Sequence, residues 1–227
     1  MRKLFFVLSV CAISFPVAQA GSIVDRTTLV SLLGGPGVTE NFEAFSVGSE
    51  SSTGMSCAVL NASAVCNEQG PGLVVGGVNF TFGSGGGQWD GPGYFGSTSK
   101  ELLSGAPAGQ PLTIDFTSGV TAFGVDLRAF STFGATAALS VYASDDTTLI
   151  GTLPGIGLSA DGALVFAGWS DAAGIGMVQL TQAGQPWSPI IDNLEFGAAG
   201  NQTPEPATGM LFVAGFACLA IRRKLAR

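Results

Sequence analysis

Short runs of apolar or alternating residues recur along the middle of the chain, and they are the strongest constraint on its fold. The clearest run is 121–129, where Phe123, Val125 and Leu127 alternate with small or charged residues. A period of two residues predicts a β-strand with one buried and one solvent-facing side. Further runs of this kind occupy residues 73–82, 112–116, 137–143, 149–153, 164–169, 175–180 and 190–196, each bounded by Gly, Pro, Asp or Ser.

The spacing of these runs leaves little room for crossover helices. The 34 glycines also indicate many tight turns. We therefore predict an all-β fold, an antiparallel jelly-roll-like β-sandwich over residues 21–200. A β-solenoid is the alternative fold, and it is disfavoured because the sequence has no fixed repeat period. One short helix is expected at residues 25–33, with Asp25 as its N-cap and glycines after its last apolar residue.

The N-terminus has the composition of a signal peptide. Arg2 and Lys3 precede an apolar stretch, and small residues at Ala18 and Ala20 suit a cleavage site. We predict that residues 1–20 are removed on export. A lipoprotein signal, with Cys11 as the modified residue, is disfavoured because Val10 is bulky for the preceding position.

The C-terminus has the composition of a membrane anchor. An apolar run at 207–221 is followed by basic residues at Arg222, Arg223, Lys224 and Arg227. As a helix this run would span about 22 Å, short of the roughly 30 Å hydrocarbon core, so it crosses only if the flanking cations snorkel. The basic cluster should stay cytoplasmic, which places the preceding residues in the periplasm. The sequence thus predicts an inner-membrane-anchored precursor with a single short transmembrane helix.

Residues 201–227 resemble a PEP-CTERM sorting signal. Pro204, Glu205 and Pro206 match its Pro-Glu-Pro box, and the apolar run and basic end follow in the family's order. The resemblance implies processing by an exosortase. It also implies delivery to the cell envelope or extracellular matrix of a Gram-negative bacterium that makes exopolysaccharide. A plain C-terminal anchor is the alternative, since proline before a helix is common for backbone reasons alone.

The predicted exported domain is strongly acidic. All sixteen carboxylates lie between Asp25 and Glu205, and that span holds only three cations, Arg26, Lys100 and Arg128, which leaves about thirteen excess negative charges. Such a domain should repel phosphate backbones, so we expect no nucleic-acid partner. Divalent cations or neutral glycans are more natural partners.

The chain contains no histidine. This removes the commonest general base, the Ser-His-Asp arrangement and the usual zinc ligand sets. Paired carboxylates, as in glycosidases, remain formally open. Because no motif supports catalysis, we predict that the protein is not an enzyme.

Cys57 and Cys66 are the only cysteine pair in the predicted exported domain, since Cys11 lies in the signal peptide and Cys218 in the apolar tail. An oxidising compartment and this close spacing favour a disulfide over two free thiols.

The glycine-rich loop 83–95 is the best candidate ligand site. It places Trp89 and Tyr94 beside polar residues, and Trp169 and Trp187 also occur in turn-like contexts. Trp89, Tyr94 and Trp169 are therefore candidates for stacking on sugar rings. The favoured interpretation is that the tryptophans are half-buried and cap the ends of the sandwich, because large aromatic residues are mostly buried.

Asp192 interrupts an otherwise apolar strand face. A carboxylate facing a core must be hydrogen-bonded, paired or bound to a cation. Calcium is one hypothesis, with Asp192, Asn193, Asp145 and Asp146 as oxygen ligands. A β-bulge, or a carboxylate bonded to backbone amides, is favoured over it. The pair Asp145 and Asp146 is most simply a hairpin turn. We expect no other cofactor.

Together these patterns predict an exosortase-sorted surface or matrix protein with a structural or adhesive role in an exopolysaccharide matrix. The alternative is a glycan-binding module, in which Trp89, Tyr94 and Trp169 would carry the affinity. Residues 112–127 and 191–196 are similar to strands of other PEP-CTERM proteins and of jelly-roll carbohydrate-binding modules, which implies a sandwich and no particular ligand.

Overall fold

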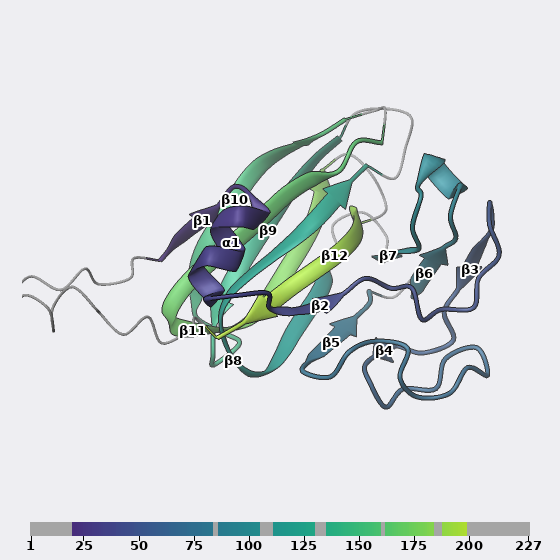
Figure 1. The fold of residues 1–227 in the computed structure, drawn as a ribbon, viewed down its shortest axis with the longest axis horizontal. Helices are drawn as coiled ribbons and strands as arrows, with labels where there is room; N and C mark the ends of the chain where they lie inside the picture. The colour runs from purple at the N-terminus through teal and green to yellow at the C-terminus, as the bar shows by residue number, and fades with distance from the viewer. Residues whose placement is uncertain are drawn as a thin grey trace, which may run out of the picture.

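The computed structural model describes residues 20–83, 86–104, 111–129, 135–159, 162–183 and 188–198. Within them the chain forms twelve strands, one α-helix and one 3-10 turn (Figure 1). The elements are β1 (Gly21–Ile23), α1 (Arg26–Leu33), β2 (Val38–Glu40), β3 (Ser52–Gly54), β4 (Val59–Leu60), β5 (Val78–Thr81), β6 (Gly87–Asp90), η1 (Tyr94–Gly96), β7 (Glu101–Ser104), β8 (Leu112–Arg128), β9 (Ala135–Ala143), β10 (Leu149–Leu158), β11 (Val165–Ala183) and β12 (Ile190–Gly197).

The predicted signal-peptide core and sorting tail lie outside the described residues. This includes the predicted transmembrane run 207–221 and the basic residues that follow it. Over the ranges given above, no helix combines the length and hydropathy needed to cross a bilayer.

All twelve strands join one antiparallel sheet, in the order β10-β9-β11-β8-β12-β7-β6-β3. β1 pairs with β11, β2 with β12, and β5 with β8 and β4. The prediction of an all-β antiparallel fold is confirmed. The finer prediction of a jelly-roll-like sandwich is not shown, because a single hydrogen-bonded network connects all twelve strands into one sheet.

The sheet is continuous because β8 and β11 are long enough to run through both of its halves. β8 has 17 residues and β11 has 19. The first part of β8 pairs with β5 and the second part with β12. Between Ser170 and Ile175 the register of β11 on β8 shifts, and Gly174, with φ 105°, supplies the left-handed backbone there. Each long strand thus replaces two predicted short ones.

Both halves of the sheet enclose one hydrophobic core. The ring of Phe116, from the first part of β8, lies 5.7 Å from that of Phe123 and 5.2 Å from that of Phe196 in β12. Ile114 and Val125, one from each part of β8, are fully buried in the same cluster. The long strands therefore carry the chain around a shared core, as strands do where they turn a sandwich corner.

Helix α1 covers the opposite face of β8. Asp25 caps it by accepting a hydrogen bond from Thr28 N at 2.8 Å, and Leu29 and Leu33 pack on Ala122. Gly124 lies beneath the helix, where a Cβ would meet the Phe166 ring. The predicted helix and its cap are confirmed. The predicted wet face of 121–129 is wrong, since this helix covers Ala122 and Gly124 and Arg128 is buried beside Glu101.

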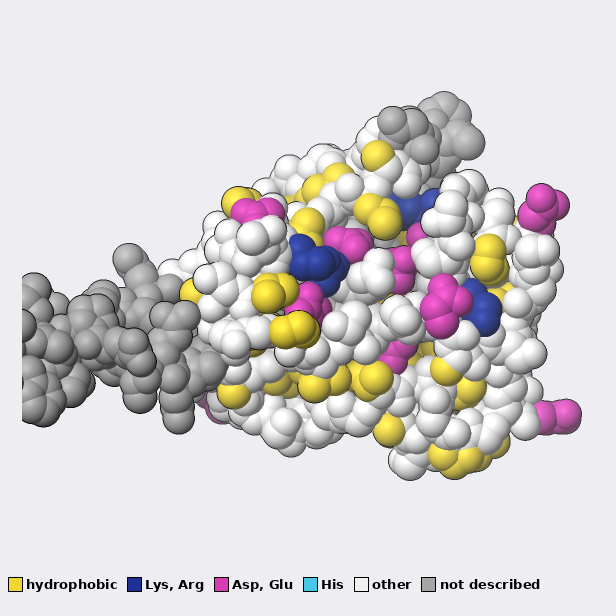
Figure 2. All heavy atoms as spheres, in the orientation of Figure 1, with side chains coloured by type: hydrophobic (Ala, Val, Ile, Leu, Met, Phe, Trp, Pro, Cys, Tyr) yellow, Lys and Arg dark blue, Asp and Glu magenta, His cyan; other side chains and the backbone are white. Residues whose placement is uncertain are grey.

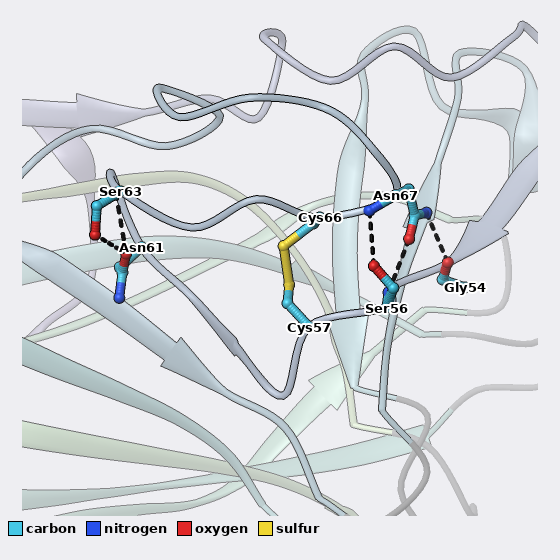
Figure 3. The surroundings of a disulfide bond; sticks show 7 residues. All are labelled: Gly54, Ser56, Cys57, Asn61, Ser63, Cys66 and Asn67. Carbon is cyan, nitrogen blue, oxygen red and sulfur yellow. Dashed lines mark hydrogen bonds between the residues drawn. A yellow bond between two sulfur atoms is a disulfide. The ribbon is translucent and has the colours of Figure 1, made fainter.

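The disulfide between Cys57 and Cys66 is present, with a Cα–Cα distance of 5.3 Å (Figure 3). Asn67, next to Cys66, donates to Gly54 O and accepts from Ser56 N, both at 2.8 Å. These bonds fasten the disulfide loop to the segment that follows β3. The predicted cross-link is therefore confirmed.

We expect the double substitution Cys57→Ala and Cys66→Ala to lower the free energy of unfolding by about 2–3 kcal/mol, because the unfolded chain regains the entropy of an open loop of this length. Urea unfolding in oxidising buffer measures the difference. Adding reductant to the wild type should produce a similar loss. A double variant as stable as the oxidised wild type would contradict this account.

Candidate functional site

The basic side chains of the exported domain lie on one face of the sheet among carboxylates. Arg26 pairs with Asp126 and Glu195, Lys100 with Glu43, and Arg128 with Glu101. Figure 2 shows this face, with dark blue side chains beside magenta ones. We call Arg26, Asp90, Glu101, Asp126, Arg128, Asp192 and Glu195 the charged seam.

Arg26, the first residue of α1, joins the helix to two strands. Its Nη1 donates to Glu195 Oε2 at 2.8 Å, and its Nη2 donates to Asp126 Oδ2 and to Asn193 O at 3.0 Å each. The guanidinium also lies 5.2 Å from the centre of the Phe166 ring. The Glu195 side chain is only 5% exposed, so water cannot stabilise its negative charge. The positive charge of Arg26 stabilises it instead.

Asp192 is held by protein groups at an irregular point in β12. Its Oδ1 accepts from Asn193 N at 2.7 Å and its Oδ2 from Ser99 Oγ at 2.6 Å. The register with β8 shifts between Asp192 and Glu195, and Asn193 has a φ of 45°. The favoured interpretation, a bulge with a backbone-bonded carboxylate, is confirmed. Burial raises the pKa of Asp192 despite these bonds.

The structure does not bring the four proposed calcium ligands into one group. Asp145 lies in the β9–β10 turn, where its Oδ1 accepts from Thr147 N at 2.9 Å and from Thr148 N at 2.8 Å. The hairpin-turn prediction is therefore confirmed. Over the described ranges, no three His, Cys, Asp or Glu side chains are grouped so that they could hold a metal ion. Calcium binding stays a prediction without a geometric site.

Arg128 ends β8 between two buried carboxylates. Asp90 of β6 and Glu101 of β7 are direct cross-strand partners. Arg128 Nη2 donates to Glu101, and both side chains are almost completely buried. Asp90 Oδ1 accepts from Gln88 Nε2 at 2.8 Å, while its Oδ2 is buried with no hydrogen-bond partner among the described residues. One arginine can balance only one of these two charges.

Burial raises the pKa of Glu101 to about 7 and that of Asp90 to about 6, in each case against the attraction of Arg128. The Gln88 hydrogen bond also lowers the pKa of Asp90, but by less than burial raises it. The geometry gives the same result, because a second uncompensated charge at this depth would be costly. This part of the charged seam therefore retains a proton near neutral pH. Asp90 and Glu101 both lie below the surface, and Arg128 attracts both carboxylates.

The proposed sugar-stacking residues do not form a platform. Trp89 is 1% exposed and stacks on Phe45 in the core, so it offers no free ring face. This corrects the proposal for Trp89. Trp169 is half-buried, and its ring packs over Gly151 of β10. Tyr94 begins the short turn η1, and Trp187 lies outside the described residues.

A neutral pocket, which the sequence analysis did not identify, lies beside the disulfide loop. Its volume is about 330 Å³, and no charged or aromatic side chain lines it. The lining residues are Asn61, Ala62, Ser63, Gly77, Val78, Asn79 and Thr117. Asn61 and Ser63, the polar residues inside the cysteine loop, were its only signal in the sequence.

The tail has a recognised identity, although it lies outside the described residues. A family model of the PEP-CTERM protein-sorting motif matches residues 202–224, which include the Pro-Glu-Pro box and the first three residues of the basic cluster. No curated protein and no solved structure is detectably similar to the chain. The motif is the recognition signal for exosortase processing, and it marks an exported protein of Gram-negative type.

We expect Arg26→Ala to lower the free energy of unfolding by about 1–3 kcal/mol, since it leaves Glu195 buried beside Asp126 without a cation. Lys100→Ala is the matched control. The Glu43 side chain is 46% exposed and lies 3.8 Å from Lys100 Nζ, so we expect a loss below about 1 kcal/mol. Urea unfolding compares the two. Equal losses of unfolding free energy in the two variants would show that the ion pairs of Arg26 contribute no more than an ordinary surface ion pair.

The raised pKa values predict that stability falls as pH rises. Between about pH 4 and pH 7 the folded state holds protons on Asp90 and Glu101 that the unfolded chain releases, so the free energy of unfolding decreases across this window. We expect a total decrease of roughly 1–3 kcal/mol. Asp145, whose pKa is lowered to about 2, acts in the opposite direction only at lower pH.

Urea unfolding at several pH values measures this slope. Asp90→Asn should flatten it, because one titrating group is removed, whereas Glu68→Gln on the surface should leave it unchanged. A rise in stability from pH 5 to pH 8 would contradict the assignment.

Proposed function

We propose that the protein is a structural or adhesive component of an exopolysaccharide matrix, which an exosortase processes from an inner-membrane precursor. The observation that carries this proposal is the sorting motif at residues 202–224. The tail contains the elements needed for transient anchoring: an apolar run and, after it, the cations Arg222, Arg223, Lys224 and Arg227. The folded domain before it is the part that remains after processing.

The position of the chain ends supports a tethered precursor. Gly21 pairs with Ser170, Ser170 with Ala122, and Ala122 with Gly197, the last residue of β12. The two ends of the folded domain thus lie in one cross-strand row, about three strand spacings or roughly 14 Å apart. Residues 198–201 separate β12 from the motif, a reach of about 15 Å at most. The domain would therefore stay close to the membrane until processing.

The charge distribution of the exported domain favours neutral or cationic polymers as its surroundings. Arg26, Lys100 and Arg128 are all engaged by carboxylates, so none of them offers an unpaired positive charge to a polyanion. The acidic excess of the exported domain disfavours nucleic acid and acidic polysaccharides. The proposal therefore favours neutral polysaccharide as the surrounding matrix. We propose no catalytic role, because the sequence has no histidine and no motif that supports catalysis.

We expect the combined change Pro204→Ala, Glu205→Gln and Pro206→Ala to leave the full-length chain in the inner membrane, because the exosortase would no longer recognise its substrate. Cell fractionation and immunoblotting of the native host measure the distribution. The matched control changes Ala199 to Ser and Asn201 to Gln, just before the motif. Release of the box variant at the wild-type level would reduce the tail to a simple anchor.

A further inference from the structure

Three segments that are distant in sequence meet at the neutral pocket. The disulfide loop contributes Asn61 and Ser63, and the start of β5 contributes Asn79. Thr117 comes from the β8 bend, by which we mean residues 116–119, where the pairing of β8 with β11 is interrupted. Every one of these side chains can donate and accept hydrogen bonds, and none is charged. The domain as a whole, residues 21–200, carries about twelve excess negative charges, fifteen carboxylates against three cations.

The disulfide loop holds its part of the pocket in a fixed shape. Asn61 Oδ1 accepts from Ser63 N at 3.0 Å and from Ser63 Oγ at 2.9 Å. Gly72 N donates to Ala62 O at 2.8 Å, and the Cys57–Cys66 bond closes the loop. Figure 3 shows the amide nitrogen of Asn61 directed away from Ser63. The Asn61 oxygen accepts both hydrogen bonds from Ser63, so the Asn61 amide nitrogen can donate to a ligand.

The other side of the pocket is equally fixed. Thr117 N donates to Gly77 O at 2.9 Å, which joins the β8 bend to the residue before β5. Asn79 lies in β5 opposite Asp115, and its carboxamide has no hydrogen-bond partner among the described residues. The pocket therefore combines a rigid backbone with two amide groups that retain hydrogen-bonding capacity. Such preorganisation lowers the entropic cost of binding.

We propose that this pocket binds a neutral saccharide unit. Hydroxyl groups of sugars pair with amides and hydroxyls that both donate and accept, whereas a charged ligand would find no opposite charge in the lining. The pocket is an open surface hollow of about 330 Å³, so it contacts only a short segment of a saccharide. Without an aromatic ring, the affinity of the site is weak, about millimolar.

The proposal rests on the proposed matrix role, since it names the ligand class and the site. It is tested with the processed protein purified from its host. The probe is the neutral oligosaccharide fraction from partial hydrolysis of the host's own exopolysaccharide, titrated by NMR. An oligomer of uronic acids is the charged comparison. We expect the wild type to bind the neutral fraction and not the uronate.

Two substitutions separate the pocket from the fold. Asn61→Asp keeps the oxygen that accepts from Ser63 but removes the nitrogen donor, and Asn79→Ala removes the carboxamide from the opposite wall without placing a charge opposite Asp115. Each should weaken binding at least five-fold. Asn41→Asp is the matched control, because Asn41 Oδ1 likewise accepts from a backbone amide two residues on, that of Glu43, outside the pocket. Unchanged melting temperatures confirm that all three variants fold.

The outcomes distinguish this inference from the matrix role. Equal binding by the wild type and both pocket variants would overturn the pocket as the site. Absence of wild-type binding to the neutral fraction, or preference for the uronate, would overturn the ligand class. Neither result would change where the protein resides. Failure of the matrix role would instead appear as wild-type protein missing from the extracellular polysaccharide fraction.

Discussion

β8 and β11 are shared by both halves of the sheet, and the remaining elements are positioned by them. The second part of β8 carries Asp126 and Arg128 of the charged seam, whereas its bend carries Thr117 of the neutral pocket. β11 packs beside it along almost its whole length and receives β1 at one end. A change that straightened either strand would separate the halves of the core and displace both sites.

Local patterns predicted the local structure correctly. The cap at Asp25, the turn at Asp145 and the Cys57–Cys66 bond each depend on residues close in sequence. The continuity of β8 through residues 117–119 was not predictable, because Ser118 and Gly119 are as typical of a turn as of a bent strand. The burial of Arg128 was missed for a different reason: its partners Glu101 and Asp90 are distant in sequence, and no pattern connects them.

The candidate sites also divide into features set by residues close in sequence and features set by tertiary contacts. Aromatic residues in a glycine-rich loop suggested a sugar platform, but Trp89 belongs to the core because β6 pairs on both sides, with β3 and β7. The neutral pocket depends on the meeting of β5, the β8 bend and the disulfide loop, which only the tertiary structure supplies. The sorting tail needs no tertiary context, since its recognition depends on a contiguous motif. The function of the tail could therefore be predicted from the sequence alone.

We propose that a disulfide-linked β domain is exported and then separated from its sorting tail. Intact-mass spectrometry of the wild-type protein from the extracellular fraction of its native host tests this most directly. We predict a species that begins at Gly21, retains the Cys57–Cys66 disulfide and lacks the basic cluster beginning at Arg222. Recovery of only full-length chain, confined to the membrane fraction, would contradict the claim.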